Sequence, residues 1–499
     1  MGVVRRQSIK HSIVSLTGLL IGAVSTLFLY PHVLDEYGLV QTLLTIGIVS
    51  MPLLSLGANT VVLRYFPRFE DQETGHHGFL SLLLLMCLIG WTTAVVLALL
   101  GKFVLGIWPM TQSPMLREYL WMAAPLALLF IVNTILNQYS SNFQRIVVPT
   151  ILQDFSQKLL LPILLFAVWK DWITLETLLW LLLLHGALVM VGLAAYIGWL
   201  GQLRLRFDWA FLNRDLRREM SQFILFGGLG GFALLMASRV DVLMVSSLSS
   251  LKNSGIYAIA LYIAAVIEIP SKSLYMAAIP MIAKNLSDDN HEALSGLYHK
   301  VTVNLTLAGL LLFGATWISV DSFFEILPNG ETVSAGKYVL LFIGLARILE
   351  TITGLNNYLI YLSKYYIYSL VSLAILACAN LAFNFWLIPL LGLTGAAVAT
   401  LLSVSCYNVI SLALVWNKFR LQPFTAKIGA ALLSAAAAYL LIDQIPRLAA
   451  PLPDILLHSG LYVLVFAVLV WRFRISEDLH EMAGNWRSKW INWHKNRPV

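Results

Sequence analysis

The sequence is poor in charge and in cysteine. Only 12% of its 499 residues are Asp, Glu, Lys or Arg, whereas 59% are hydrophobic, and this balance excludes a water-soluble globular protein. Its three cysteines, Cys87, Cys378 and Cys406, all lie inside apolar runs. That placement favours packing roles over a disulfide or a metal site.

The motifs of enzymes are also missing. The chain contains no H-E-x-x-H, G-x-S-x-G or G-x-x-x-x-G-K-S/T motif, and the segments between its apolar runs are too short for a soluble catalytic domain. We therefore expect no catalytic residues, no metal site and no enzyme activity. The net charge of +7 does not indicate nucleic-acid binding, because Lys and Arg gather in alternate short loops, the pattern that orients membrane proteins.

What the sequence does contain is a series of long apolar runs. Each is long enough to cross a hydrocarbon layer of ~30 Å as a helix of about 20 residues, and none shows the period-two alternation of a membrane β-barrel. We predict an all-α polytopic membrane protein with about 14 transmembrane helices, an even number that places both termini in the cytoplasm together with most Lys and Arg residues. The predicted helices cover residues 11–30, 38–63, 79–100, 118–138, 149–169, 174–200, 221–248, 255–271, 299–319, 337–361, 367–390, 393–416, 425–445 and 455–473.

The segment 201–220 is the largest break between the apolar runs. It carries five arginines together with apolar residues at helical spacing, which predicts an amphipathic linker on the inner membrane surface. On either side we predict an N-terminal lobe of six helices, residues 1–200, and a C-terminal lobe of six helices, residues 221–416. Residues 417–473 add two helices, and the basic tail, residues 474–499, is predicted to be cytoplasmic, as an interfacial amphipathic helix or as a disordered segment.

The segment Tyr30–Arg68 recurs in a weaker form about 217 residues later, as judged from Gly38 and Gly255. In the first copy Gly38 opens an apolar helix that contains Pro52, and in the second Gly255 opens a helix that Pro270 interrupts. Two similar halves that rock about a central site are typical of alternating-access transporters. The repeat therefore predicts two pseudo-symmetric lobes.

Ionisable side chains occur inside the predicted helices, where charge is costly and marks functional sites by default. Asp154 and Lys158 are four residues apart, and Arg347 and Glu350 are three apart, so each pair shares a helix face and can form an ion pair. Two interpretations remain open. These groups line a polar cavity, or they are self-neutralised pairs that hold helices together.

Arg239 and Asp241 differ from these pairs because they are two residues apart and face nearly opposite directions. Each therefore requires a partner on another helix or a water-filled cavity. Glu268 lies near the end of its helix with Lys272 within reach. The functional hypothesis is a central cavity in which Arg239 and other cations meet an anionic substrate, while a carboxylate binds a coupling cation, H+ or Na+.

Several stretches resemble a family of polysaccharide transporters in which a Tyr-Gly-Leu turn precedes the second helix and a Leu-Gly plus Arg-Tyr pattern ends it. The similarity covers most of residues 1–420. It identifies the chain as similar to the oligosaccharide-lipid flippases (O-antigen flippase-like) of the multidrug/oligosaccharidyl-lipid/polysaccharide flippase superfamily. The matching stretches are DEYGLVQTLLTIGIV (35–49), LSLGANTVVLRYFPRF (54–69), SRVDVLMVSSLSSLKNSGIYAIALYIAAVIEIP (238–270) and LGLTGAAVATLLS (391–403).

The resemblance implies two six-helix lobes in a V, with two added C-terminal helices, in the bacterial plasma (inner) membrane. It implies a flippase that moves an undecaprenyl-pyrophosphate-linked oligosaccharide from the inner to the outer leaflet for O-antigen, capsule or exopolysaccharide biosynthesis, alongside polymerases and glycosyltransferases. The expected ligands are this lipid-linked oligosaccharide, membrane lipids and a coupling cation, with no other cofactor. The head-group cavity is expected to contain Arg64, Lys158, Arg239 and Arg347, with Asp154, Asp241, Glu268 and Glu350 as charge partners or ion-coupling groups.

Three other functions remain open from the sequence. Within the superfamily, a cluster of cavity arginines would favour a lipid II flippase, and acidic residues confined to one lobe would favour a cation-coupled multidrug antiporter. A membrane O-antigen polymerase or ligase would need a large periplasmic loop with Arg and His. The longest predicted outer loops, residues 101–117 and 320–336, are short and contain no His.

Overall fold

The computed structural model describes residues 2–71, 73–104, 113–205, 208–478 and 480. Within these residues all regular structure is helical. Thirteen helices in the described part are long and apolar enough to cross a membrane, which confirms the prediction of an all-α polytopic membrane protein. The tail that was expected to form an interfacial helix or a disordered segment lies mostly outside the described residues.

The helices fall into two compact units, one formed by residues 1–259 with 377–396 and the other by residues 260–376 with 397–499. Two helices, α12 (Leu251–Ala264) and α19 (Tyr366–Phe419), contribute residues to both. The other helices of the first unit are α1 (Gly2–Val24), α2 (Leu34–Leu54), α3 (Ala58–Arg64), α4 (Phe66–Phe69), α5 (Phe79–Val104), α6 (Pro114–Tyr119), α7 (Ala123–Ser141), α8 (Val147–Thr150), α9 (Ser156–Trp169), α10 (Leu175–Trp199) and α11 (Arg214–Leu248). Those of the second unit are α13 (Ile269–Ser287), α14 (His291–Ile318), α15 (Val320–Ile326), α16 (Gly330–Val333), α17 (Lys337–Thr353), α18 (Leu355–Leu362), α20 (Ala426–Asp443) and α21 (Pro451–Arg472).

The helix α19 joins two of the predicted helices. It is 54 residues long, which as a straight helix would be about 80 Å, far more than the ~30 Å of a bilayer core. At Gly392 the backbone turns to φ 60° and ψ −135°, a conformation that favours a residue without a Cβ. The arms on either side match the predicted helices 367–390 and 393–416, so α19 supplies both.

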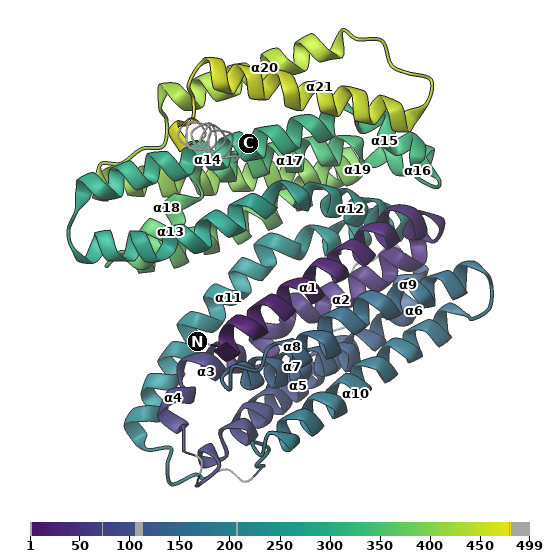
Figure 1. Ribbon diagram of the computed structural model, residues 1–499. Coiled ribbons are helices and arrows are strands. Elements are labelled where there is room, and N and C mark those ends of the chain that lie inside the picture. The colour runs from purple at the N-terminus through teal and green to yellow at the C-terminus, as the bar shows by residue number, and fades with distance from the viewer. Residues whose placement is uncertain (1, 72, 105–112, 206–207, 479, 481–499) are drawn as a thin grey trace, which may run out of the picture. The chain divides into compact units, whose positions relative to one another are not determined.

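The first unit is built around α2, which packs against α7 and α11, while α10 packs on the far side of α7 (Figure 1). An aromatic cluster lies beyond the end of α2. In it Phe69 stacks on Phe79 with ring centroids 4.4 Å apart, and Tyr139 meets Phe66 edge-on at 5.8 Å. This cluster anchors the short helices α3 and α4 to α5 and α7.

Gly227 and Gly231 of α11 face the N-terminal helices. A Cβ placed on Gly227 would lie 3.6 Å from the Thr60 hydroxyl, and one on Gly231 would lie 3.9 Å from Pro52. These are ordinary van der Waals contacts, as expected of a small-xxx-small packing face. Compact packing assigns α11 to the first unit, whereas the predicted lobe boundary at residues 201–220 rests on the charged break in the sequence and stays a prediction.

The second unit is built around α14, which contacts α13, α17, α20 and α21 (Figure 1). Tyr462 of α21 lies against Gly314 of α14, where a Cβ would meet the phenol oxygen at 2.0 Å. The Tyr462 hydroxyl donates a hydrogen bond of 3.0 Å to the Leu310 carbonyl. The C-terminal helices are therefore fixed to α14 by a small residue and a bonded tyrosine, as is usual between membrane helices.

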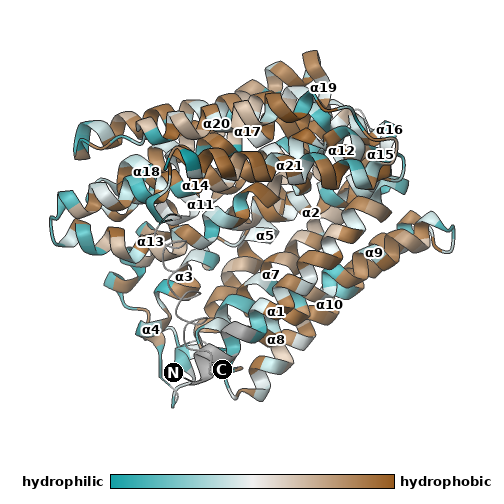
Figure 2. Cartoon of the chain, turned by 45° about the horizontal axis from the view of Figure 1, so that its top comes forward, coloured by the Kyte–Doolittle hydropathy of each residue, from teal (hydrophilic) through white to brown (hydrophobic). Residues whose placement is uncertain are grey.

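Local sequence also determines where several helices begin and which faces they expose. Hydrophobic residues run along nearly every helix (Figure 2), and outward-facing side chains such as Leu97, Leu188 and Leu464 are exposed, as expected of surfaces that contact lipid. Polar N-cap side chains accept a hydrogen bond from the backbone N–H three residues on. They are Ser113 at α6, Thr174 at α10, Asn213 at α11, Asn290 at α14 and Thr425 at α20.

Candidate functional site

Arg347 lies at the centre of a charged cluster in the second unit. Its Nη1 atom is 2.7 Å from Glu350 Oε2, one turn further along α17, and 2.5 Å from Glu268 Oε1. Glu268 ends a short 3-10 helix, Ala265–Glu268, and is also 3.4 Å from the Lys272 ammonium. The Arg347–Glu350 pair that the spacing predicts is therefore present, with a second carboxylate from another helix.

Two tyrosines border these charges. The Tyr275 hydroxyl of α13 donates to the backbone carbonyl of Glu350 at 3.3 Å, and its ring centroid lies 5.0 Å from that of Tyr358 on α18. Tyr275 fits over Gly354, where a Cβ would lie 2.0 Å from the hydroxyl. We call the six residues Glu268, Lys272, Tyr275, Arg347, Glu350 and Tyr358 the Arg347 cluster, in which two carboxylates balance two cations.

Arg239 and Asp241 of α11 differ sharply in their surroundings. Asp241 is 3% exposed and accepts a 2.7 Å hydrogen bond from the hydroxyl of Tyr257 on α12. Arg239 is exposed, and within the described part of the chain it forms no hydrogen bond or ion pair. The two-residue spacing thus separates a buried, bonded carboxylate from an exposed cation on the same membrane-spanning helix.

The expected Asp154–Lys158 ion pair is not formed between these two described residues. Asp154 belongs to a π-helical segment, Ile151–Phe155, in which the hydrogen bonds run from i to i+5 and the i, i+4 alignment of an α-helix is lost. Both side chains are exposed, and the Lys158 stem lies 3.1 Å from the position a Cβ would take on Gly18 of α1. The pairing that the i, i+4 spacing allows is therefore not seen between these two residues, and their role in a head-group cavity stays a prediction.

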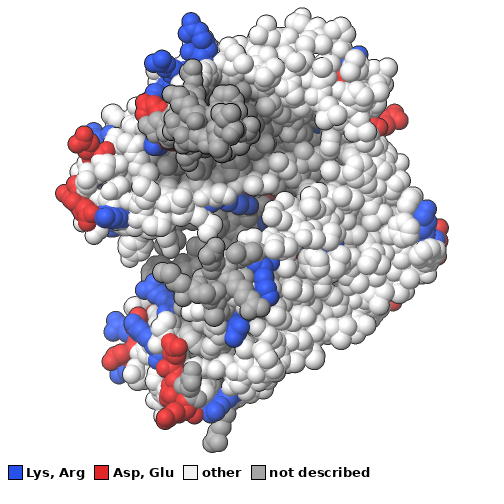
Figure 3. All heavy atoms as spheres, viewed as in Figure 1, with Lys and Arg blue, Asp and Glu red and all other residues white. Residues whose placement is uncertain are grey.

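Arg64, the fourth predicted cation, lies at the end of α3 rather than inside a membrane-spanning segment. Its guanidinium carbon is 4.3 Å from the centroid of the Phe223 ring on α11, and the adjacent Arg68 forms a 2.6 Å ion pair with Glu219. On the face shown in Figure 3, most charged side chains gather near helix ends and leave broad uncharged surfaces between them. Arg64 therefore belongs to the α3–α11 packing at such an end.

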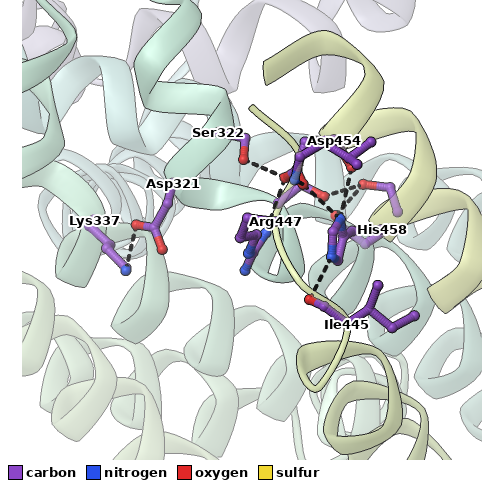
Figure 4. A network of polar contacts seen from close by, with 11 residues as sticks. Asp321, Ser322, Lys337, Ile445, Arg447, Asp454 and His458 are labelled. Carbon is purple, nitrogen blue, oxygen red and sulfur yellow. Dashed lines mark hydrogen bonds and ion pairs between the residues drawn. The ribbon is translucent and has the colours of Figure 1, made fainter. Parts of the chain in front are cut away.

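The sequence interpretation missed a buried network in the second unit (Figure 4). Asp454 and His458, one turn apart on α21, are both fully buried. Asp454 accepts hydrogen bonds from the Ser322 hydroxyl at 2.5 Å and the Leu448 amide at 2.7 Å, and it lies 3.4 Å from Arg447. The i, i+4 spacing was visible in the sequence, but the partners come from α15 and from the loop before α21.

A small cavity of about 60 Å³ lies in the first unit between α2, α7, α9 and α10. Asn133, Gln153, Gln157 and His185 supply its polar lining. His185 bonds to the Ser156 hydroxyl at 2.8 Å, and Asn133 donates to the Gly186 carbonyl at 3.0 Å. These bonds join the helices, so the cavity has room for a few water molecules and none for a lipid head group.

Comparison with known proteins agrees with this architecture, although no family model matches the chain. The probable flippase AglR of Haloferax volcanii is 23% identical over 245 residues, which cover 48% of this chain and 51% of that protein, so the match spans about half of the relative. The lipid II flippase MurJ in an inward closed conformation superposes with a TM-score of 0.69 at 13% identity, covering 94% of this chain and 100% of MurJ. An inward-facing multidrug resistance MATE family transporter of the MOP superfamily superposes with a TM-score of 0.60 at 14% identity, covering 81% of this chain and 94% of that one.

The two structural superpositions show which fold the chain has. The chain is a multi-pass membrane protein with the fold of MOP superfamily transporters. The flippase relative and the MurJ-like fold together support the flippase-family assignment that the sequence motifs predicted.

Proposed function

We propose that this protein is a flippase that moves an undecaprenyl-pyrophosphate-linked oligosaccharide from the inner to the outer leaflet of the bacterial plasma membrane. The carried glycan would serve O-antigen, capsule or exopolysaccharide synthesis, with polymerases and glycosyltransferases acting before and after this step. The flippase relative and the transporter fold support the class. The motif resemblance supports the substrate.

The observation that carries the proposal is the exposed Arg239 on a membrane-spanning helix. Moving a charged, hydroxyl-rich head group through hydrocarbon costs far more than moving the lipid tail, because polar groups lose their hydration. A flippase lowers that cost by offering polar groups at membrane depth. A guanidinium is suited to a pyrophosphate, which it can bind with two parallel hydrogen bonds.

The Arg347 cluster, in the second unit, suits sugars better than it suits a pyrophosphate. Glu268 and Glu350 already compensate Arg347, so the cluster offers an anion little net attraction. Its carboxylates and phenols instead provide acceptors and an aromatic surface for sugar hydroxyls and ring faces. We therefore propose Arg239 of the first unit as a candidate for the pyrophosphate, and the Arg347 cluster of the second unit as a separate candidate for sugars.

Lipid II flipping is the second candidate, because the MurJ likeness covers all of that protein. Purified protein in liposomes would be given two fluorescent substrates, an undecaprenyl-pyrophosphate-linked oligosaccharide and lipid II, and outward movement would be measured with and without H+ and Na+ gradients. We expect faster flipping of the oligosaccharide. A preference for lipid II would contradict the proposed substrate, and movement of neither lipid would contradict the proposed function.

Arg239→Ala is the matching variant, with Arg217→Ala, an exposed arginine near the start of the same helix, as a control of the same charge change. We expect Arg239→Ala to lose most flipping and Arg217→Ala to keep it. Equal flipping by both variants would contradict the assignment of Arg239 to the head group.

A further inference from the structure

Tyrosines gather where α18 ends and α19 begins. Five of the 19 tyrosines of the chain lie within residues 358–368. Among the described residues four tyrosines are exposed, and three of them belong to this stretch: Tyr361 at 60%, Tyr366 at 51% and Tyr368 at 45%. No tryptophan occurs within residues 318–385. An aromatic belt at a membrane interface contains both Trp and Tyr, so this group of tyrosines differs in composition from such a belt.

The turn that carries these tyrosines is fixed by its own hydrogen bonds. The Ser363 hydroxyl donates to the Ile360 carbonyl at 2.8 Å and accepts from the Tyr365 amide at 3.1 Å. The Tyr368 amide donates to the Tyr365 carbonyl at 2.9 Å. The rings are therefore presented on an ordered backbone, which lowers the entropy cost of binding a ligand.

Tyr365 anchors the turn to the second unit. Its ring meets Phe419 edge-on, with centroids 5.9 Å apart, and packs against buried residues of α13, α14 and α18. The ammonium groups of Lys364 and Lys418 lie 5.3 and 5.1 Å from its ring centroid, within the range of a cation–π interaction. We call six residues of the second unit the tyrosine patch: Tyr361, Lys364, Tyr365, Tyr366, Tyr368 and Lys418.

The tyrosine patch continues from the Arg347 cluster along one helix. Tyr358 of that cluster and Tyr361 of the patch are three residues apart on α18, so they share a helix face and are about one turn apart. In the predicted topology the helix 337–361 ends in the cytoplasm, on the side from which the proposed substrate starts. A saccharide chain that reaches the Arg347 cluster can therefore extend along α18 to the patch.

The chemistry of the tyrosine patch matches a saccharide. The C–H bonds on the face of a sugar ring carry a small positive charge and pack on the negative face of an aromatic ring. Phenol hydroxyls donate and accept hydrogen bonds, as sugar hydroxyls do, and the two ammonium groups add donors for sugar oxygens. We propose that the tyrosine patch binds the distal sugars of the lipid-linked oligosaccharide before transport. This subsite rests on the proposed function, because it serves the same substrate.

The test compares two lipids in the liposome assay, undecaprenyl-pyrophosphate that carries a single sugar and the same lipid with the full oligosaccharide. One variant combines Tyr361→Leu, Tyr366→Leu and Tyr368→Leu, which keeps apolar side chains at exposed positions where substitutions change stability little. A second variant carries Phe at the same three positions and so keeps the rings. Tyr338→Leu, at an exposed tyrosine near the start of α17, is the matched control.

We expect the leucine variant to move the full oligosaccharide about ten-fold more slowly than the native protein, the scale of losing one or two hydrogen bonds and the ring contacts. The single-sugar lipid should move at the native rate, because only the longer glycan reaches the tyrosine patch. The phenylalanine variant should keep most of the rate, and Tyr338→Leu all of it. Equal slowing of both lipids would indicate a general role at the membrane interface and overturn the subsite, as would native rates with both lipids.

If the leucine variant does not fold, nitration of the native protein decides. Tetranitromethane modifies exposed tyrosines, and mass spectrometry measures the extent at each one. The probe is the free oligosaccharide, released from its pyrophosphate by mild acid. It should protect Tyr361, Tyr366 and Tyr368 and leave Tyr338 reactive, whereas equal nitration with and without the probe would overturn the subsite.

Nitration requires no transport, so the subsite and the proposed function fail separately. A native protein that moves none of the lipids in liposomes contradicts the proposed function and leaves the protection result intact. Native flipping of the full oligosaccharide, with no protection by the probe and no loss in the leucine variant, contradicts the subsite alone.

Discussion

Arg239 and Arg347 are both arginines on membrane-spanning helices, yet they occupy opposite electrostatic situations. Arg347 is half-buried between Glu268 and Glu350, whereas Arg239 is exposed and, among the described residues, has no hydrogen-bond or ion-pair partner. A charge in a membrane helix therefore indicates function only after its partners have been identified. Compensated charges are expected to affect folding first, and uncompensated charges to affect transport first.

Asp454 is the extreme case of a compensated charge and gives the largest expected effect. Asp454→Ala removes the acceptor of Ser322 and Leu448 and leaves Arg447 without its carboxylate, so the free energy of unfolding should fall by about 3–5 kcal/mol. Thermal unfolding of purified protein measures this loss. Asp443→Ala, an exposed aspartate on α20, is the control, and equal losses from both would contradict a structural role for the network.

Arg347→Ala tests the compensated side of the comparison directly. The variant leaves Glu268 and Glu350 close together without their shared cation, and because the group is only half-buried we expect a loss of about 2 kcal/mol. Glu268→Gln, Arg347→Met and Glu350→Gln combined remove all three charges and should recover most of the stability without recovering flipping. Failure of this triple variant to regain stability would show that the charges themselves are required for folding.

Arg239→Ala tests the uncompensated arginine of this comparison. Arg239 forms no ion pair within the described residues, so the free energy of unfolding should change by no more than about 0.5 kcal/mol. The flipping rate should fall about ten-fold, equivalent to ~1.4 kcal/mol. Thermal unfolding and the liposome assay together separate the two effects. If Arg239→Ala lowered the free energy of unfolding as much as Arg347→Ala does, the distinction between a compensated and an uncompensated arginine would be contradicted.

Asp478 gives the smallest expected effect and a distinct pH dependence. A hydrogen bond from Lys300 lowers the pKa of Asp478, with a further contribution from Asn304. A lowered carboxylate pKa stabilises the folded state above the unfolded pKa of about 4, and that stabilisation is lost as the pH falls through the folded pKa. Asp478→Asn should therefore cost about 0.5 kcal/mol at pH 7 and progressively less as the pH falls through the lowered folded pKa, as measured by thermal unfolding.

Hydrophobic run length was sufficient to predict most of the fold, because a bilayer requires long apolar helices. The sequence repeat could be noticed from the residues alone, whereas the close approach of Gly38 to the Leu251 carbonyl and of Gly255 to the Leu34 carbonyl requires coordinates. Residue spacing predicted Arg347–Glu350 but could not supply Glu268 as a partner from another helix. Residue spacing also did not indicate the π-helical segment that contains Asp154, since such a segment has no clear local sequence signal.

The positive φ of Gly392 has a consequence for how the chain enters the membrane. Lys364 precedes α19, Lys418 lies in its last turn, and no Asp, Glu, Lys or Arg lies between them. Neither arm therefore has a flanking charge at the Gly392 end to fix its own orientation. The turn at Gly392 is too short and too apolar to form a loop exposed to water. We therefore expect both arms to be oriented by the same two lysines and to insert into the membrane together.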